Sequence, residues 1–149
     1  MTSNKICYKR LASELKKISS NVVSGVKVES TKDMLNWNAV IEGPPDTPYE
    51  NGKFKLNLKF NEDYPIKPPS VKFLEPAKIF HPNVYRDGKI CVDILQKEWS
   101  PVQNVRSILI SIRSLLMDPN PNSPANREAA KLFTSNFSKY CETVKSKMK

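Results

Sequence analysis

One cysteine, one histidine and one asparagine lie close together in the middle of the chain and could do chemistry. Cys91 follows a turn that contains Gly88, and His81 precedes the cysteine by ten residues. A cysteine thiolate is a nucleophile, and a neighbouring imidazole can act as its general base. The side-chain amide of Asn83 is a neutral donor of the kind that stabilises an oxyanion in acyl transfer. These residue types indicate acyl-transfer chemistry on a thiol.

Each of the three residues also has a purely structural interpretation. A free cysteine such as Cys91 is often buried and packs as a small apolar side chain. His81 is followed directly by Pro82, which restricts the backbone of the histidine and favours a role in holding a loop. No protease motif and no third, orienting partner surround Cys91, so a thiol protease is disfavoured. Asn83 could equally hold a turn.

Three cysteines and one histidine do not have the spacing of a Cys/His zinc site, and nothing indicates a disulfide framework. Cys7 and Cys141 fall within predicted helices, where we interpret them as structural. We therefore expect no bound metal and a reducing compartment, the cytoplasm or the nucleus. The segment 1–20 mixes basic with apolar residues, unlike a signal peptide, and no apolar run approaches the roughly 20 residues of a membrane span.

The length and composition are those of one domain that spans residues 1–149. Apolar residues make up 39% of the chain and charged residues 26%, as in an ordinary soluble globule. Lys and Arg outnumber Asp and Glu by 24 to 15, which gives a net charge of +9. Because no RNA-binding aromatic motif accompanies these scattered charges, we expect weak nonspecific attraction to nucleic acid and no specific binding.

Hydrophobic periodicity predicts a helix followed by a sheet in the first half of the chain. Leu11, Leu15 and Ile18 form an apolar stripe at helical spacing, which ends before Gly25. This stripe is flanked by a basic, solvated margin formed by Lys9, Arg10, Lys16 and Lys17. Alternating apolar residues then predict strands over 35–42 and 54–60, a shorter strand over 71–73 and a weak one over 26–29. The turn-rich links predict an antiparallel meander, covered on one side.

The second half of the chain opens with an irregular stretch, residues 78–101, which contains His81 and Cys91. Long loops inside a compact domain are usually functional. Helical spacing returns over 105–116 and over 133–144, with a bend near 135–136. The predicted fold class is therefore α+β: an N-terminal helix, a four-stranded antiparallel meander sheet, a long active-site loop and C-terminal helices.

Several separated motifs resemble those of the ubiquitin-conjugating enzymes. Phe80-His81-Pro82-Asn83 is followed by Cys91 and then by Trp99-Ser100-Pro101. The resemblance covers almost the whole chain, in family order and spacing, through Trp37, Gly43-Pro44, Thr47-Pro48-Tyr49, Gly52, Phe54, Tyr64-Pro65, Lys67-Pro68-Pro69 and Asp118-Pro119-Asn120-Pro121. Within the family, Asn83-Val84-Tyr85 and Ser123-Pro124-Ala125-Asn126 are most similar to the branch associated with DNA repair and histone ubiquitination.

The resemblance implies a mechanism. Cys91 would accept the C-terminal glycine of ubiquitin from an activating enzyme as a thioester, and a substrate lysine would then attack it. Asn83 would stabilise the developing oxyanion or hold the loop that shapes it, while His81 and Pro82 would be structural. No bound cofactor is implied, because ATP is consumed by the activating enzyme and the chain has no phosphate-binding Gly-rich loop.

Ser123 matches a position where many family members have an acidic residue that orients or deprotonates the incoming lysine. Serine cannot act as that base at neutral pH, so slow transfer without a ligase is expected. Phosphorylation of Ser123 would restore a negative charge. The Ser123-Pro124 pair also has the pattern of a helix N-cap followed by proline, and we favour this N-cap role.

The resemblance also assigns partner surfaces by position. Lys5, Lys9 and Arg10 match the basic face that contacts the activating enzyme and ligases. Ile66 and Pro101-Val102 match the apolar loops that contact RING-type ligases, although members that bind many ligases have phenylalanine at the position of Ile66. The alternative is a solvated helix face with ordinary loop residues. The expected partners are ubiquitin, the activating enzyme, RING-type ligases and protein substrates, with no membrane.

Three rival functions follow from the same sequence. Inactive scaffolds of this fold lack the cysteine, so Cys91 argues against that function. A nucleic-acid binder is suggested by the charge alone. A conjugating enzyme for a ubiquitin-like modifier would share the mechanism, but the segment from Cys91 to Trp99 is short and lacks the insertion of the SUMO-directed members, which favours ubiquitin.

Overall fold

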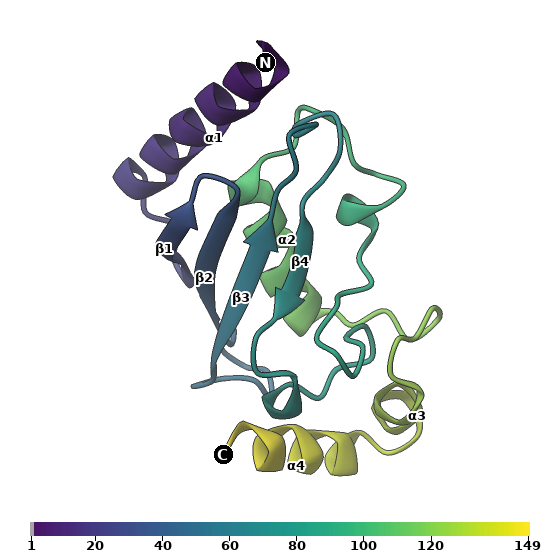
Figure 1. Ribbon diagram of the computed structural model, residues 1–149. Coiled ribbons are helices and arrows are strands. Elements are labelled where there is room, and N and C mark those ends of the chain that lie inside the picture. The colour runs from purple at the N-terminus through teal and green to yellow at the C-terminus, as the bar shows by residue number, and fades with distance from the viewer. Residues whose placement is uncertain (1) are drawn as a thin grey trace.

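A helix, a four-stranded sheet and three further helices follow one another along the chain (Figure 1). The computed structural model describes residues 2–149, with side chains from residue 6 onward. The helices are α1 (Thr2–Ser20), α2 (Val105–Met117), α3 (Arg127–Ser135) and α4 (Phe137–Met148); the strands are β1 (Val26–Asp33), β2 (Asn36–Glu42), β3 (Lys53–Lys59) and β4 (Ser70–Phe73); two 3-10 turns are η1 (Pro76–Lys78) and η2 (Asp93–Leu95). None of the described helices is both long and apolar enough to cross a membrane.

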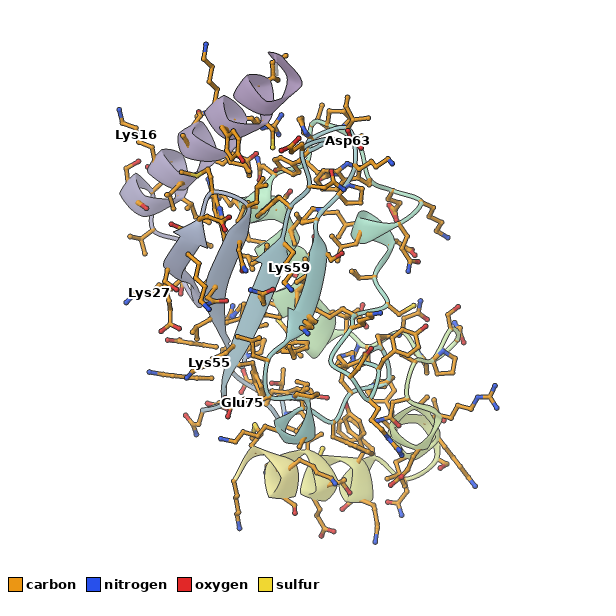
Figure 2. The ribbon with its side chains drawn as sticks, in the orientation of Figure 1. Lys16, Lys27, Lys55, Lys59, Asp63 and Glu75 are labelled. Atoms are coloured by element: carbon orange, nitrogen blue, oxygen red, sulfur yellow. The ribbon has the colours of Figure 1, made fainter. Side chains whose placement is uncertain are left out.

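The sheet is an antiparallel meander in the order β1-β2-β3-β4. Trp37, Ala39 and Ile41 of β2 are buried on one face, as the period of two predicts. Helix α2 covers this face, while the opposite face lies open and carries lysines such as Lys27 and Lys55 (Figures 1 and 2). The predicted α+β fold and the one-sided cover of the sheet are therefore confirmed.

The first strand is longer than the sequence indicates. The weak signal over 26–29 becomes an eight-residue strand, Val26–Asp33. Its second half is polar and mostly exposed, so no alternation of apolar residues marks it in the sequence. Pairing with β2 continues instead through two register shifts, and irregularities of this kind belong to sheet edges.

The expected N-cap at Ser123 is wrong. Helix α3 begins at Arg127, and the side chain of Asn126 accepts a hydrogen bond from the Ala129 amide at 3.0 Å. Asparagine is as good an N-cap as serine, and here it stands three residues further along the chain. The predicted bend near 135–136 is confirmed as a full break, because Asn136 ends α3 and caps α4.

Arg10 does not belong to the solvated margin of the first helix, as the sequence suggested. Its guanidinium donates to Glu14 at 2.7 Å and to the carbonyl oxygens of Pro101 and Gln103 at 3.0 and 2.8 Å. It also lies over the ring of Tyr64. Arginine is suited to this position because its several N–H groups can serve three acceptors at once.

The buried carboxylate of Glu14 joins α1 to two further segments. It accepts hydrogen bonds from the Tyr64 hydroxyl at 2.6 Å and from the Val105 amide, at the start of α2, at 2.7 Å. A carboxylate at a helix N-terminus is favoured by the helix dipole and by the free N–H groups there. Burial and this hydrogen bond raise the pKa of Tyr64, which keeps the hydroxyl protonated and donating.

We expect Glu14→Ala to lower the free energy of unfolding by about 3 kcal/mol, because it leaves a buried hydroxyl and a helix N-terminal amide without their acceptor. Urea denaturation measures this loss. Glu142→Ala, at an exposed position of α4, is the matched control and should change stability by less than about 0.5 kcal/mol. Equal, small losses in the two variants would contradict the structural role of Glu14.

Candidate active site

Three consecutive residues, His81, Pro82 and Asn83, hold the segments around Cys91 together. The backbone N–H of Asn83 donates to Nδ1 of His81 at 2.9 Å, so this ring nitrogen is an acceptor and Nε2 carries the proton. Nε2 then donates to the carbonyl oxygen of Leu115 near the end of α2, at 2.7 Å. Nε2 therefore ties the loop to α2, while Nδ1 holds the loop's own backbone at Asn83.

The environment of His81 keeps the imidazole neutral. The side chain is completely buried. Burial lowers the pKa to about 4, although the hydrogen bond to the Leu115 carbonyl acts in the opposite direction. A neutral imidazole whose nitrogens are both hydrogen-bonded has no free lone pair for a thiol.

Pro82 and Asn83 fasten the segment that leads into α3. The Pro82 carbonyl accepts hydrogen bonds from the amides of Ala125 and Asn126 at 2.8 and 3.0 Å. The side chain of Asn83 makes two hydrogen bonds to the backbone of Asn120. Its Oδ1 accepts from the Asn120 N–H at 2.8 Å, and its Nδ2 donates to the Asn120 carbonyl oxygen at 2.7 Å. Such a two-point contact fixes the position of the 120–126 segment relative to the cysteine loop.

Cys91 lies directly across from Asn83. Its amide donates to the Asn83 carbonyl at 2.8 Å, and the bridge between Val84 and Ile90 closes the intervening loop. Gly88 turns this loop with a φ of +95°, and a Cβ atom there would lie 2.3 Å from the Phe73 carbonyl oxygen, so the loop packs against β4 through a position that only glycine fits.

The thiol of Cys91 opens into a polar groove of about 490 Å³. Sγ is partly exposed and lies 3.9 Å from the Ser123 carbonyl oxygen. Ser107, Ser111 and Leu115 of α2 line the groove as well. The other lining residues include Asn83, Asp93, Lys97, Glu98 and Asn120.

Cys91, Asn83 and Ser123 all line the groove. The Asn83 side chain binds the backbone of Asn120, and the Ser123 side chain makes no contact with the thiol among the hydrogen bonds found. Ser123 is exposed, and its backbone carbonyl is the group that contacts the thiol. The other two cysteines are free thiols in helices, and burial raises the pKa of Cys7. Among the described residues there is no cluster of three or more His, Cys, Asp or Glu that could hold a metal.

The expected partner residues do not line the groove of Cys91. Ile66 and Val102 are 71% and 83% exposed, and Pro101 is exposed beside Val102. Lys9 is exposed on α1, whereas the Arg10 side chain is taken up by the contacts described above. The side chain of Lys5 lies outside the described residues.

Sequence reasoning missed several residues of the groove. Asn120 was noted only as part of a motif, yet its backbone is the partner of Asn83. Asp93, Lys97 and Glu98 received no role, although all three line the groove beside Cys91. These three charged residues follow Cys91 within seven positions of the sequence, and this proximity was the signal that could have identified them.

Comparison with known proteins agrees with this geometry. The family model described as ubiquitin-conjugating enzyme matches residues 10–148. The chain is 54% identical over 139 residues to ubiquitin-conjugating enzyme E2 2 of Mycosarcoma maydis, covering 93% of this chain and 74% of that protein. It is 53% identical over 137 residues to ubiquitin-conjugating enzyme E2 1 of Caenorhabditis elegans (91% and 70%) and 50% identical over 137 residues to ubiquitin-conjugating enzyme E2 3 of Arabidopsis thaliana (91% and 90%).

The fold, the thiol at the mouth of a groove and these relatives define a class of acyl-transferring enzymes. The chain belongs to the ubiquitin-conjugating enzyme family. It is a transferase whose partners are, in general, ubiquitin, an activating enzyme and ubiquitin ligases.

The depressed pKa of His81 predicts a loss of stability in mild acid. Between its unfolded pKa of 6.5 and its folded pKa of about 4, the unfolded state binds more protons, so stability falls as pH decreases. From pH 7 to pH 5 we expect a loss of about 2 kcal/mol from this group. Urea denaturation of the protein and of His81→Gln at both pH values measures it, because the variant has no histidine left. Equal losses in both proteins would show that His81 is not responsible.

Proposed function

We propose that Cys91 is the residue that carries ubiquitin. The observation that carries the proposal is the position of its thiol, partly exposed at the mouth of a polar groove and fixed by the hydrogen bond from its amide to Asn83. Cys7 is buried, and Cys141 lies in α4, so neither offers a comparable position.

The reaction consists of two acyl transfers. The Cys91 thiolate attacks the thioester that joins the C-terminal glycine of ubiquitin to the activating enzyme, and the thiolate of that enzyme leaves. A substrate amine then attacks the new thioester, a C–N bond forms, and the C–S bond to Cys91 breaks. Exchange between thioesters of similar energy needs little activation, so a histidine base is not required for the first step.

The residues around Cys91 act on this reaction through position. In this proposal Asn83 holds the 120–126 segment in place, because its side-chain oxygen and nitrogen both bind the backbone of Asn120. The amide nitrogen retains a second N–H, which leaves Asn83 able to donate to an oxyanion as well. His81 and Pro82 are positioning residues of the same loop, because their polar atoms contact protein backbone.

The proposal extends to setting and partners. We propose that one domain, residues 1–149, performs the reaction without a bound metal or cofactor, in the cytoplasm or nucleus, and that ATP is used only by the activating enzyme. Ile66, Pro101 and Val102 form the proposed contact surface for RING-type ligases, and their exposure supports it. Membership of the DNA-repair and histone-ubiquitinating branch is proposed from the 83–85 and 123–126 segments alone.

The partner surface expected on α1 changes in one respect, the role of Arg10. Lys9, with Lys5, is proposed to contact the activating enzyme and ligases, since Lys9 is exposed. We propose that Arg10 acts on the same partners indirectly, because its guanidinium holds the backbone of Pro101 and Gln103 in the ligase-binding loop. Substrates, in this proposal, are protein lysines.

A charging reaction with ubiquitin, activating enzyme and ATP tests the proposal for Cys91. We expect an adduct of one ubiquitin that thiol reagents release, seen by comparing reducing with non-reducing gels. Cys91→Ala should lose the adduct completely, and Cys91→Ser should form one that resists thiols, because an oxygen ester replaces the thioester. Cys141→Ala is the control and should charge normally. Charging of Cys91→Ala would refute the proposal, and charging only by another modifier would change the pathway.

Serine at position 123 should make transfer without a ligase slow. We expect Ser123→Asp to speed the discharge of the ubiquitin thioester onto free lysine by about tenfold, because a carboxylate near the thioester can orient and deprotonate the amine. Single-turnover discharge at pH 7 measures the rate, and Ser123→Asn is the uncharged control. An unchanged rate in Ser123→Asp would count against this role of the position.

A further inference from the structure

Two buried tyrosines lie behind the tripeptide that holds the active site. Tyr49 and Tyr140 are 0% and 1% exposed, and neither lines the groove of Cys91. The hydroxyl of Tyr49 donates to the carbonyl oxygen of Phe80, the residue immediately before His81. The hydroxyls of the two tyrosines are hydrogen-bonded to each other. The pair therefore joins α4, which carries Tyr140, to the start of the tripeptide.

The direction of these hydrogen bonds follows from the chemistry of the three groups. A carbonyl oxygen can only accept, so the single proton of the Tyr49 hydroxyl is used for Phe80. Tyr140 must then be the donor in the contact between the two hydroxyls. Burial raises the pKa of Tyr49 well above its usual range and that of Tyr140 to about 12, so both hydroxyls stay protonated. Because hydrogen bonds in a buried chain polarise one another, Tyr140 strengthens the bond that Tyr49 makes.

The backbone of Tyr49 is fixed in the turn before β3. Its N–H donates to the hydroxyl oxygen of Thr47 at 3.2 Å, and its carbonyl oxygen accepts from the Gly52 N–H at 2.9 Å. A Cβ atom at Gly43, directly after β2, would lie 1.7 Å from the same carbonyl oxygen, so the backbones pack in close contact there. The ring of Tyr49 packs against the imidazole of His81, with the ring centroids 5.8 Å apart. The Tyr49 hydroxyl is therefore presented to the tripeptide from a rigid turn.

The ring of Tyr140 is held by aromatic side chains from both C-terminal helices. Phe133 of α3 and Phe137 of α4 lie with their centroids 5.2 and 5.8 Å from that of Tyr140, and Phe80 lies at 6.0 Å. Helix α4 lies across one end of the sheet (Figure 1). The segment 120–126, which leads into these helices, is bound to the other end of the tripeptide. The C-terminal part of the chain thus contacts the tripeptide from two sides.

We propose that Tyr49 and Tyr140 are positioning residues for the transfer of ubiquitin from Cys91. The proposal rests on the proposed function of Cys91. The Tyr49 hydroxyl fixes the peptide unit between Phe80 and His81, and with it the tripeptide and the segment that the tripeptide binds. Tyr140 orients this hydroxyl from α4. Neither tyrosine contacts the reacting atoms, and no proton of either takes part in the reaction.

Attack by the amine is the step that depends most on this position. The amine and the thioester carbonyl must meet in the groove in the correct geometry, and a misplacement of about 1 Å can cost on the order of 100-fold in rate. Exchange between two thioesters of similar energy needs little activation. Loss of the Tyr49 hydroxyl should therefore slow discharge of the thioester more than it slows charging.

Tyr64 provides a matched control for Tyr49. It is 2% exposed, and its hydroxyl donates to Glu14 at 2.6 Å. Tyr64→Phe removes one buried hydroxyl and its hydrogen bond, as Tyr49→Phe does, but at a contact with α1. Tyr64 does not line the groove. A difference in discharge between the two variants therefore reports on the tripeptide and not on stability.

The experiment measures single-turnover discharge of the ubiquitin thioester onto free lysine, at a temperature at which circular dichroism shows every variant folded. We expect discharge to be roughly fivefold slower in Tyr49→Phe and about twofold slower in Tyr140→Phe. Tyr64→Phe should match the unchanged protein, and all variants should charge at the same rate. The double variant of Tyr49→Phe and Tyr140→Phe should discharge as slowly as Tyr49→Phe alone, because Tyr140 acts only through Tyr49.

A spectroscopic measurement tests the position of the tripeptide directly. In ¹H–¹⁵N spectra of the uncharged protein, the side-chain amide signals of Asn83 report on its contacts with Asn120. We expect these signals to shift in Tyr49→Phe and to stay in place in Tyr64→Phe. If Tyr49→Phe does not fold, Tyr140→Phe gives the same test, because it leaves the bond from Tyr49 to Phe80 in place.

Each alternative result has a definite meaning. Normal discharge by Tyr49→Phe, an equal loss in Tyr64→Phe, or Asn83 signals that do not move would overturn the inference and leave the proposed function intact. Losses that multiply in the double variant would show that the two tyrosines act separately, which also overturns it. Failure of the unchanged protein to charge would overturn the proposed function of Cys91, and the inference with it.

Discussion

The arrangement of the active site depends on the hydrogen bonds of one tripeptide, His81-Pro82-Asn83. Through it, the end of α2, the segment before α3 and the loop of Cys91 are joined. All of these contacts are made to backbone atoms. The side chains that they hold can therefore vary while the path of the chain around the thiol stays fixed.

This construction explains why the histidine beside a reactive cysteine is not a base. Full burial keeps His81 neutral, and both of its nitrogens are engaged in holding the loop. A thioester next to a competent base and water would be hydrolysed, whereas a carrier must keep its acyl group until an amine arrives. The polar groove beside Cys91 meets that need, because it gives an amine access without providing a strong base.

Much of this could be predicted from the sequence, and the failures share a cause. Helical and strand periods located the core because they reflect burial, and the loop of Cys91 stood out through its irregularity. The predicted N-cap was wrong because serine and asparagine are equally good caps. The hydrogen bonds that the amides of Ala125 and Asn126 donate to the Pro82 carbonyl hold the segment before α3, and the helix begins after it. The position of Arg10 was wrong for a similar reason: the two carbonyl oxygens that it binds lie some 90 residues away, and sequence spacing does not show such contacts.

The contacts of Arg10 and Glu14 have a consequence for how ligase preference can diverge among relatives. Arg10 and Glu14 of α1 bind the backbone of the segment that carries Pro101 and Val102, so the conformation of this loop depends on residues outside it. A transplant of that loop into another scaffold would carry its side chains but lose its conformation. Positions 10 and 14 should therefore co-vary with the residues around 101–105, and an engineered change of ligase would have to exchange both segments together.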